Sequence, residues 1–450
     1  MAHWAAYLGL DYMLARFVGT SQIGKNMRGN YRRHARSNAL RVWRVGPTLA
    51  ALYLAVIALP TAAADHPGQR FSIQFQDLPA PGATRSASNG PRAVRQPSDA
   101  NLAVPEGFKV NVFAEGLSHA RWLVVASNGD VFVAEPNAGR VTLLRDTVGD
   151  GRADTGGIFI SGLDRPHGMA ISGAYLYVTT PRNIFRIPYT PGDTMARGPA
   201  ELVGLPGMLG DGRGHWTRNI AFAADGASFF VAVGSRSNIS IEPAPRATVQ
   251  RFNLDGTAQA SFASGLRNSV GIAFRPGTND LYVVVNERDG LGDGLVPDYF
   301  TRVQSGDFFG WPYAYSGAHP APTWGAVKPD LVALTKAPDL MFQAHSAPLG
   351  LVFYEGQQFP EEYKGNAFVA LHGSWNSAQP TGYKVVRIPF NAKGPAAYYE
   401  NFLTGFWLRG TSPAQVFGRP VGLAVAADGS LLVADDTSQT IWRVSYNPNP

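Results

Sequence analysis

The chain has 450 residues, of which 45% are hydrophobic and 16% are charged, so it is long enough to bury a large core. The 50 glycines and 33 prolines favour many short strands with tight turns over long helices, and the lack of cysteine excludes disulfides and thiol chemistry. The net charge of +6 does not indicate nucleic-acid binding, because residues 1–64 hold eight Lys and Arg against one acid and the remainder is nearly neutral.

The first 64 residues have the features of a targeting segment. A basic region leads into "LAALYLAVIAL" (Leu49–Leu59) and then "PTAAAD", which is typical of a secretory signal peptide. We expect cleavage after Ala64 and export to the periplasm or the medium. The alternative is an uncleaved membrane anchor, although the apolar run is shorter than the roughly 20 residues of a membrane span. Residues 65–103 are rich in Pro, Ser and Gln and predict a linker.

Residues 104–447 contain six copies of one pattern: a glycine or polar start, a strand of the form "hGhAh", a Gly/Asp/Asn turn, and a strand like "LYVV". The copies start at Gly116, Gly162, Gly214, Gly265, His345 and Gly418. A third strand often follows, and insertions explain the uneven spacing. This predicts an all-β fold, a six-bladed β-propeller with four-stranded antiparallel blades. The segment Gly107–Leu117 should supply the outer strand of the last blade and close the ring.

In a propeller the first strand of each blade lines the central channel, so residues just before these strands should gather at one mouth. A His or Arg stands three to five residues before the second position of every "hGhAh" copy: His119, Arg165, His215, Arg267 (with Asn268), His345 and Arg419. Clustered cations repel one another and lose hydration. The ring therefore predicts an anionic or multiply hydrogen-bonding ligand, although any single member could have a core or capping role.

The loop "NERDGLGDGLVPDYF" follows the second strand of the fourth copy and carries four acidic residues among glycines: Glu287, Asp289, Asp293 and Asp298. Oxygen ligands on a flexible loop suit Ca²⁺, and the lack of His and Cys argues against Zn²⁺; the alternative is a solvated turn. A second acidic string carries Asp146, Asp150 and Asp154, but it should lie at the blade periphery, as a structural ion site or a plain turn.

Two further stretches could reach the mouth. "GDFFGWPY" (306–313) could wall a planar ligand, and "LHGSWNSAQPTGYKVV" (371–386) offers four candidates: His372, Trp375, Asn376 and Lys384. No Rossmann G-x-G-x-x-G, G-x-S-x-G elbow or Walker motif occurs in a suitable context.

These stretches, together with "GHWTRNIAF", "GLRNSVGIAF" and "GRPVGLAVAADGSLLVADD", resemble the soluble pyrroloquinoline quinone (PQQ) dependent glucose and sorbosone dehydrogenases, most of all the sorbosone branch, over about 104–447. The resemblance implies a sugar substrate, PQQ (a flat o-quinone with three carboxylates), Ca²⁺, and an external quinone or cytochrome as electron acceptor. It implies a general base at His215. It implies cofactor contacts from Arg267, Asn268, Lys384, Arg419, His372 and Trp375, and Ca²⁺ near Asp289 and Gly290, with Glu287, Asp293 and Asp298 as further ligands.

The chain departs from the family at the base. Glucose-oxidising relatives carry a carboxylate where this chain has Ser235, and the sorbosone branch often has cysteines where Ser237 and Ser240 stand. Two alternatives to a sugar dehydrogenase therefore remain open: a non-catalytic binding propeller, and a Ca²⁺-dependent lactonase-type hydrolase. We expect contact with a membrane only through an uncleaved targeting segment.

Overall fold

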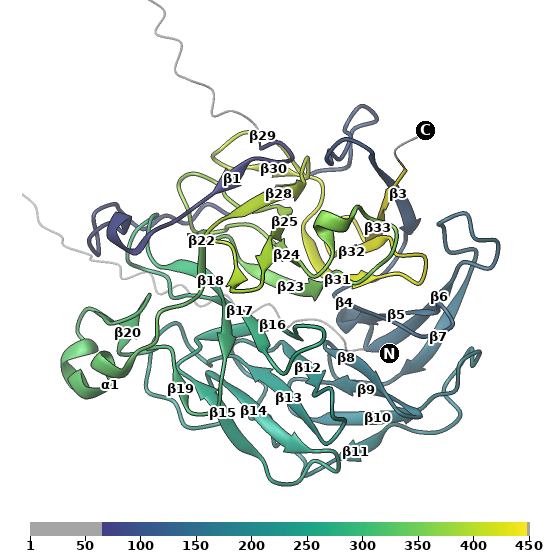
Figure 1. The fold of residues 1–450 in the computed structure, drawn as a ribbon, viewed down its shortest axis with the longest axis horizontal. Helices are drawn as coiled ribbons and strands as arrows, with labels where there is room; N and C mark the ends of the chain where they lie inside the picture. Colours follow the sequence, from purple (N-terminus) through teal and green to yellow (C-terminus); the bar gives the residue numbers. More distant parts are fainter. Residues whose placement is uncertain (1–64, 448–450) are drawn as a thin grey trace, which may run out of the picture. The chain divides into compact units, whose positions relative to one another are not determined.

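A computed structural model describes residues 65–447, which form six antiparallel sheets around one axis (Figure 1). The predicted six-bladed β-propeller is therefore confirmed. The predicted targeting segment, residues 1–64, lies outside the described residues. Within residues 65–447, no helix is both long enough and apolar enough to cross a bilayer.

Each blade is a meander whose first strand is innermost. Blade 1 contains β4 (Trp122–Val125), β5 (Val131–Glu135), β6 (Arg140–Arg145) and β7 (Thr155–Ser161). Blade 2 contains β8 (Met169–Ser172), β9 (Tyr175–Thr179), β10 (Ile184–Pro188) and β11 (Glu201–Val203). Blade 3 contains β12 (Arg218–Phe222), β13 (Ser228–Val233), β14 (Thr248–Asn253) and β15 (Ala260–Ser264).

Blades 4 and 5 follow the same plan. Blade 4 contains β16 (Asn268–Phe274), β17 (Leu281–Asn286), β18 (Pro297–Val303) and β22 (Leu340–Ala344). Blade 5 contains β23 (Pro348–Phe353), β24 (Ala367–Leu371), β25 (Lys384–Ile388) and β28 (Tyr399–Leu403). The second strands β5, β13 and β24 are buried along their whole length, because neighbouring blades cover both of their faces.

Blade 6 joins the two ends of the propeller. It contains β31 (Pro420–Val425), β32 (Leu431–Asp435) and β33 (Thr440–Tyr446), and its outer strand is β3 (Phe108–Ala114). β3 pairs antiparallel with β33, from Phe108 opposite Tyr446 to Ala114 opposite Ile441. The predicted closing role of Gly107–Leu117 is confirmed, and closure leaves no inner sheet edge open.

The glycines of the "hGhAh" pattern lie where neighbouring inner strands approach most closely. A Cβ added at Gly422 would lie 2.5 Å from the backbone oxygen of Arg121 in blade 1, and one at Gly271 would lie 2.6 Å from that of Leu349 in blade 5. Gly168 and Gly350 are equally crowded by backbone. The pattern therefore reflects packing around the axis, since only glycine leaves room for the next blade.

Residues 65–103 do not form the free linker that their composition suggested. β1 (Arg70–Phe71) adds a fifth strand to blade 5 by pairing with β28, and β2 (Arg92–Ala93) pairs with β30 (Gln415–Val416). Between them, Asn89 Nδ2 donates to the carbonyl of Thr411 over 2.7 Å, and Thr84 Oγ1 accepts from the amide of Asp293 over 2.8 Å. This segment thus contacts the loops that carry Asp293 and Thr411.

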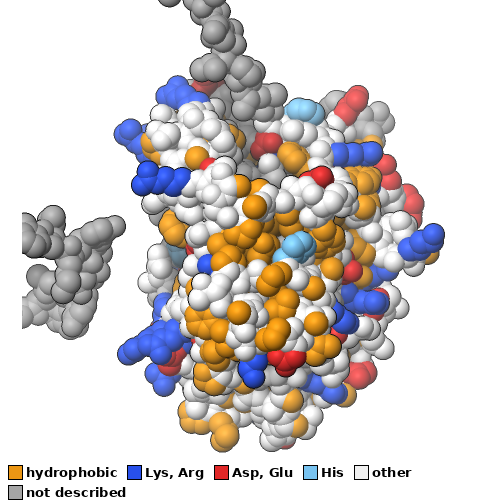
Figure 2. Space-filling view, turned by 90° about the vertical axis from the view of Figure 1, so that its left-hand side faces the viewer, with side chains coloured by type: hydrophobic (Ala, Val, Ile, Leu, Met, Phe, Trp, Pro, Cys, Tyr) orange, Lys and Arg blue, Asp and Glu red, His pale blue; other side chains and the backbone are white. Residues whose placement is uncertain are grey.

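One insertion accounts for the longest repeat spacing. Residues 304–339 separate β18 from β22 and include β19 (Asp307–Phe308), which joins blade 3 beside β15, and the short helix α1 (Pro329–Leu334). Figure 2 views the side of the molecule that carries α1 in Figure 1 and shows hydrophobic side chains gathered there. Leu334 and Val327 are among the exposed hydrophobic residues, and neither lines the channel mouth.

Candidate functional site

A cavity of about 230 Å³ opens at the mouth of the channel, where the inner strands of blades 3, 4 and 5 begin. Its lining comes from segments far apart in the sequence: His215, Arg267, Asn268, Asn286, Glu287, Asp289, Asp298, His345, Ala347, Trp375 and Asn376. The structure thus brings the predicted base, three predicted cofactor contacts and three of the predicted acidic residues into one place.

The imidazole of His215 is hydrogen-bonded through only one of its two nitrogens among the described residues. Its Nδ1 lies 2.9 Å from the backbone oxygen of Ser235 and 3.0 Å from Ser235 Oγ, whereas Nε2 has no bond to any residue in the described part of the chain. Burial, and then the positive charge of Arg267, lower the pKa of His215 to about 3. The fully buried Arg218 donates to the backbone oxygen of His215 over 2.8 Å, which fixes the start of β12.

Arg267 is buried and bonded on all sides. It donates to the backbone oxygens of Asn238 (3.1 Å) and Glu287 (2.7 Å) and pairs with Asp289 over 3.4 Å. It therefore contributes a fixed positive charge to the cavity wall. The neighbouring Asn268 has a buried side-chain oxygen without a partner among the described residues, which leaves one polar group available to a ligand.

Two buried carboxyl groups also line the cavity. Glu287 is 4% exposed, and burial raises its pKa to about 7. Burial likewise raises the pKa of Asp298 to about 7, although this carboxylate accepts from the backbone amides of Glu287 and Ala347, each over 2.8 Å. Glu287 Oε1 has no partner among the described residues. An unpaired carboxylate oxygen of this kind fits a cation that prefers oxygen ligands, such as Ca²⁺.

The four acidic residues of the loop do not form one cage. Asp293 lies outside the cavity, where it accepts from the amide of Ala378 over 3.0 Å, and Gly290 is an exposed turn residue with φ of 93°. Asp289 accepts from Asn376 Nδ2 and pairs with Arg267. Among residues 65–447, no group of three or more His, Asp or Glu side chains is arranged to hold a metal ion. Side chains near Glu287 would therefore have to act together with backbone oxygens.

A second polar group at the same mouth surrounds Asp436, which sequence reasoning missed. Arg121 pairs with Asp436 over 2.6 Å, His372 lies 3.0 Å away and His119 lies 3.4 Å away. Burial opposes ionisation, but these basic groups hold the pKa of Asp436 well below its usual range. Arg419 donates to the backbone oxygens of His372 (3.0 Å) and Gly373 (2.9 Å), so it belongs to this group.

A positional rule would have found Asp436. Ser235, Glu287, His372 and Asp436 each stand within two residues of the end of a second strand, and antiparallel pairing places that end beside the start of the first strand. Asp436 follows the second strand of the sixth copy, as Glu287 and His372 follow those of the fourth and fifth. The predicted ring of six is therefore divided: His215, Arg267 and His345 line the cavity, while His119 and Arg419 lie in the Asp436 group.

The remaining ring member, Arg165, lies 5.8 Å from the ring centroid of Trp216, and Arg121 lies 5.6 Å from it. Arg165, His119 and His345 all have left-handed backbone, with φ of 47°, 60° and 66°. For residues other than glycine this conformation is costly. Ala347, just before the inner strand of blade 5, has the same conformation with φ of 55°, so the strain belongs to the backbone that leads into the inner strands.

Several predicted residues lie elsewhere or play another part. Lys384 is buried away from the cavity and donates to Asp65 over 3.0 Å, with Phe71 on its other side. The aromatic loop 306–313 is packed into the fold, where Trp311 Nε1 donates to the backbone oxygen of Asn238. Trp375 is 52% exposed at the rim of the cavity.

The second acidic string is a turn rather than an ion site. Asp146 accepts from the amides of Gly149 and Gly151, and Asp154 accepts from Thr147. Backbone donors thus satisfy both carboxylates.

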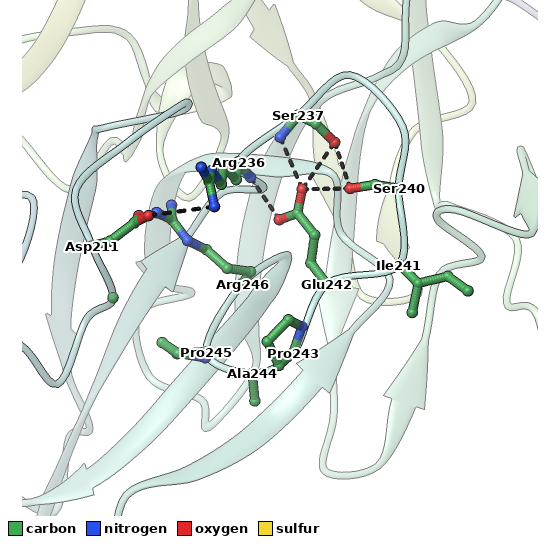
Figure 3. A pocket seen from close by; sticks show the side chains of 11 residues that line it. Asp211, Arg236, Ser237, Ser240, Ile241, Glu242, Pro243, Ala244, Pro245 and Arg246 are labelled. Atoms are coloured by element: carbon green, nitrogen blue, oxygen red, sulfur yellow. Dashed lines mark hydrogen bonds and ion pairs between the residues drawn. The ribbon is translucent and has the colours of Figure 1, made fainter.

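A wider cleft of about 540 Å³ lies beside the loop that follows β13 (Figure 3). Asp211 pairs with Arg246 on one wall, while Glu242 accepts from Ser237 and Ser240 on the other. Ser237 and Ser240, which stand where the sorbosone branch often has cysteines, therefore serve as donors to one carboxylate.

The residues present fit a flat polyanion together with an oxygen-seeking cation. Arg121 Nε is a buried donor without a partner among the described residues, and His119 Nδ1 is a second buried nitrogen without one. Glu287 Oε1 is the matching acceptor for a cation. Lys384 does not fit, because Asp65 already neutralises it.

A closed six-bladed propeller with a charged site at one end of its axis is the class of protein that this geometry defines. The chain belongs to the TrAA12-like family, whose model matches residues 102–296 and 331–447. A curated relative, the pyrroloquinoline quinone-dependent pyranose dehydrogenase of Coprinopsis cinerea, is 27% identical over 78% of this chain and 55% of its own length. A second, an uncharacterized protein of Borreliella burgdorferi, is 36% identical over 52% of this chain and 61% of its own. The chain thus spans little more than half the length of these relatives.

Solved structures support the fold. The holo form of the pyranose dehydrogenase PQQ domain from Coprinopsis cinerea has a TM-score of 0.65 at 22% identity, over 79% of this chain and 99% of that one. The PQQ-bound aldose sugar dehydrogenase of Streptomyces coelicolor has a TM-score of 0.52 at 20% identity, over 76% of this chain and 99% of that one.

Proposed function

We propose that this protein is a PQQ- and Ca²⁺-dependent dehydrogenase that oxidises an aldose or sugar aldehyde of the glucose or sorbosone kind. The observation that carries the proposal is the position of His215, whose Nδ1 is bonded to Ser235 while its Nε2 has no partner among the described residues, in one cavity with Glu287 and Asp298. Relatedness to sugar dehydrogenases that carry PQQ supports it. We further propose export to the periplasm or the medium and an external quinone or cytochrome as electron acceptor.

Each residue then has a defined part. Glu287 and Asp298, with nearby backbone oxygens, would hold Ca²⁺. Arg267, Asn268, Arg419 and the Asp436 group would face the carboxylates and oxygens of PQQ, and Trp375 would cover its plane. When bound, PQQ supplies the acceptor for a hydride, and Ca²⁺ polarises a quinone carbonyl. His215 Nε2 accepts the proton of the sugar hydroxyl as the C–H bond of the adjacent carbon breaks.

Metal-free protein, given PQQ and CaCl₂ singly and together, tests the proposal. The absorbance of bound quinone reports binding, and dye reduction with a panel of aldoses and sorbosone reports turnover. We expect turnover only with both additions, and a loss of roughly 10²–10⁴-fold in His215→Ala with binding retained. No binding of PQQ would refute the proposal.

A non-catalytic binding propeller is the second candidate, and Ser235 in place of a carboxylate is the observation that favours it. Binding of PQQ without turnover on any sugar would support that reading. For the lactonase-type reading, no observation among residues 65–447 favours a hydrolase over a dehydrogenase.

A further inference from the structure

We propose that Ser235, on a loop held by Glu242, is the positioning residue for His215 and takes the place of the missing carboxylate. The inference rests on the proposed function, because it names what orients the proposed base.

The backbone oxygen of Ser235 decides which ring nitrogen of His215 carries the proton. This oxygen lies 2.9 Å from Nδ1, and a carbonyl can only accept a hydrogen bond. Nδ1 must therefore be protonated, and the uncharged ring has its lone pair on Nε2, the atom that faces the cavity. The same oxygen accepts the backbone amide of His215 over 3.1 Å, so ring and backbone are fixed by one atom.

The hydroxyl of Ser235 adds a second acceptor. Ser235 Oγ donates to the backbone oxygen of Ser237 over 2.7 Å, which commits its only proton. The Oγ lone pairs remain for His215 Nδ1, 3.0 Å away. Nδ1–H is thus shared between two oxygens of one residue, and rotation of the imidazole would break both bonds.

Glu242 sets the position of the Ser237 carbonyl. Its carboxylate accepts from the amides of Arg236 (2.6 Å) and Ser237 (2.9 Å) and from the hydroxyls of Ser237 and Ser240, each over 2.9 Å. Figure 3 shows these bonds drawing the loop around one side chain. Gly234 completes the arrangement, because a Cβ there would lie 2.7 Å from the Cβ of His215.

Because Ser235 is uncharged, it affects the pKa of His215 differently from a carboxylate. A carboxylate beside Nδ1 would stabilise the imidazolium, whereas a carbonyl and a hydroxyl stabilise it less. The charged and titratable groups around the ring are Arg267, Arg218 and Arg246 beside it, and Glu287, Asp289, Asp298 and His345 across the cavity. Burial, and then the three guanidinium groups, favour the neutral ring. His215 should therefore remain a free proton acceptor in mildly acidic solution.

Nitrogen NMR of ¹⁵N-histidine-labelled full-length protein tests this without PQQ or Ca²⁺, with His215→Gln to assign the resonances. We expect a neutral Nδ1–H ring at pH 5 in the wild type. Ser235→Asp should raise the pKa of His215 by about one to three units and move the acidic limb of kcat/KM upward by the same amount.

The companion variants separate positioning from folding. Ser235→Ala and Glu242→Gln should lower kcat about three- to tenfold, the effect of one lost hydrogen bond, with little change in KM. Ser235→Thr, which keeps the hydroxyl, should restore part of the rate. Ser161→Ala and Glu201→Gln, on the outer strands of blades 1 and 2, are matched controls that should resemble the wild type.

An Nε2–H ring in the wild type, or the same His215 pKa in Ser235→Asp, would overturn the inference. Absence of turnover on every sugar would instead refute the proposed function, and the NMR result would still decide the role of Ser235.

Discussion

Gly422 joins blade 6 to blade 1, and replacing it by alanine tests how tightly the propeller is closed. The added Cβ would lie 2.5 Å from the backbone oxygen of Arg121 and 3.0 Å from the Cα of Trp122. Real Cβ atoms essentially never approach closer than 3.0 Å, so β31 and β4 must separate by about 0.5 Å. Both obstacles are backbone, so no flexible side chain can move aside.

The magnitude follows from overpacking. Forcing an extra carbon into a packed interior typically costs about 1–3 kcal/mol. Gly157, in β7, is the matched control, because a Cβ there meets no atom within 4 Å and its φ is not positive. Gly157→Ala should stabilise the protein by about 0.4–1 kcal/mol through the unfolded chain. The two variants should therefore differ by about 1.4–4 kcal/mol.

Urea unfolding followed by tryptophan fluorescence measures this difference. We expect Gly422→Ala to unfold at a lower urea concentration than the wild type, and Gly157→Ala at a slightly higher one. The shift should also move Arg121 relative to Asp436, whose 2.6 Å ion pair spans the same joint. Equal midpoints for Gly422→Ala and the wild type would show that the inner strands can separate freely, contrary to our account of the glycine pattern.

Three further predictions concern strain, pH and metal. Arg165→Gly should be more stable than Arg165→Ala by about 1–2 kcal/mol in the same urea assay, because the backbone at Arg165 is left-handed; equal stabilities would remove the argument from strain. His167 is fully buried, and burial lowers its pKa from 6.5 to about 3. Below pH 6.5 the histidine is therefore protonated in the unfolded chain but not in the folded one. The free energy of unfolding should fall as pH decreases from 6.5 toward 3. The free energy of unfolding should fall by about 2 kcal/mol between pH 7 and pH 5, and its dependence on pH should be weaker in His167→Gln. The same pH dependence in that variant would show that His167 is protonated in the folded protein. Ca²⁺ at one hundred times its Kd should stabilise the wild type by about 2.7 kcal/mol, and it should stabilise Glu287→Gln much less. Urea unfolding with CaCl₂ or with EDTA measures both effects. Equal stabilisation of the two proteins would show that Ca²⁺ binds elsewhere.

The site was predictable wherever function depends on position in a repeat. His215, Arg267, Asn268 and His345 begin inner strands, and the propeller geometry alone brings them to one cavity. Lys384 shows the limit of this reasoning, because its partner, Asp65, lies 319 positions away in a segment that composition suggested was a linker. Charge pairing between distant segments leaves no mark in the local sequence.

The repeat pattern by itself determined the number of blades, the closing role of β3 and the mouth at which basic residues gather, because each depends on hydrophobic periodicity and turn residues within a few positions. Only the tertiary structure decided how the ring divides between the cavity and the Asp436 group. The sequence already showed Ser235 in place of a carboxylate, but only the structure showed that both its backbone oxygen and its hydroxyl contact His215 Nδ1. Hydrogen bonds and burial depend on which side chains meet across blades, and that is a property of the closed ring rather than of any one repeat.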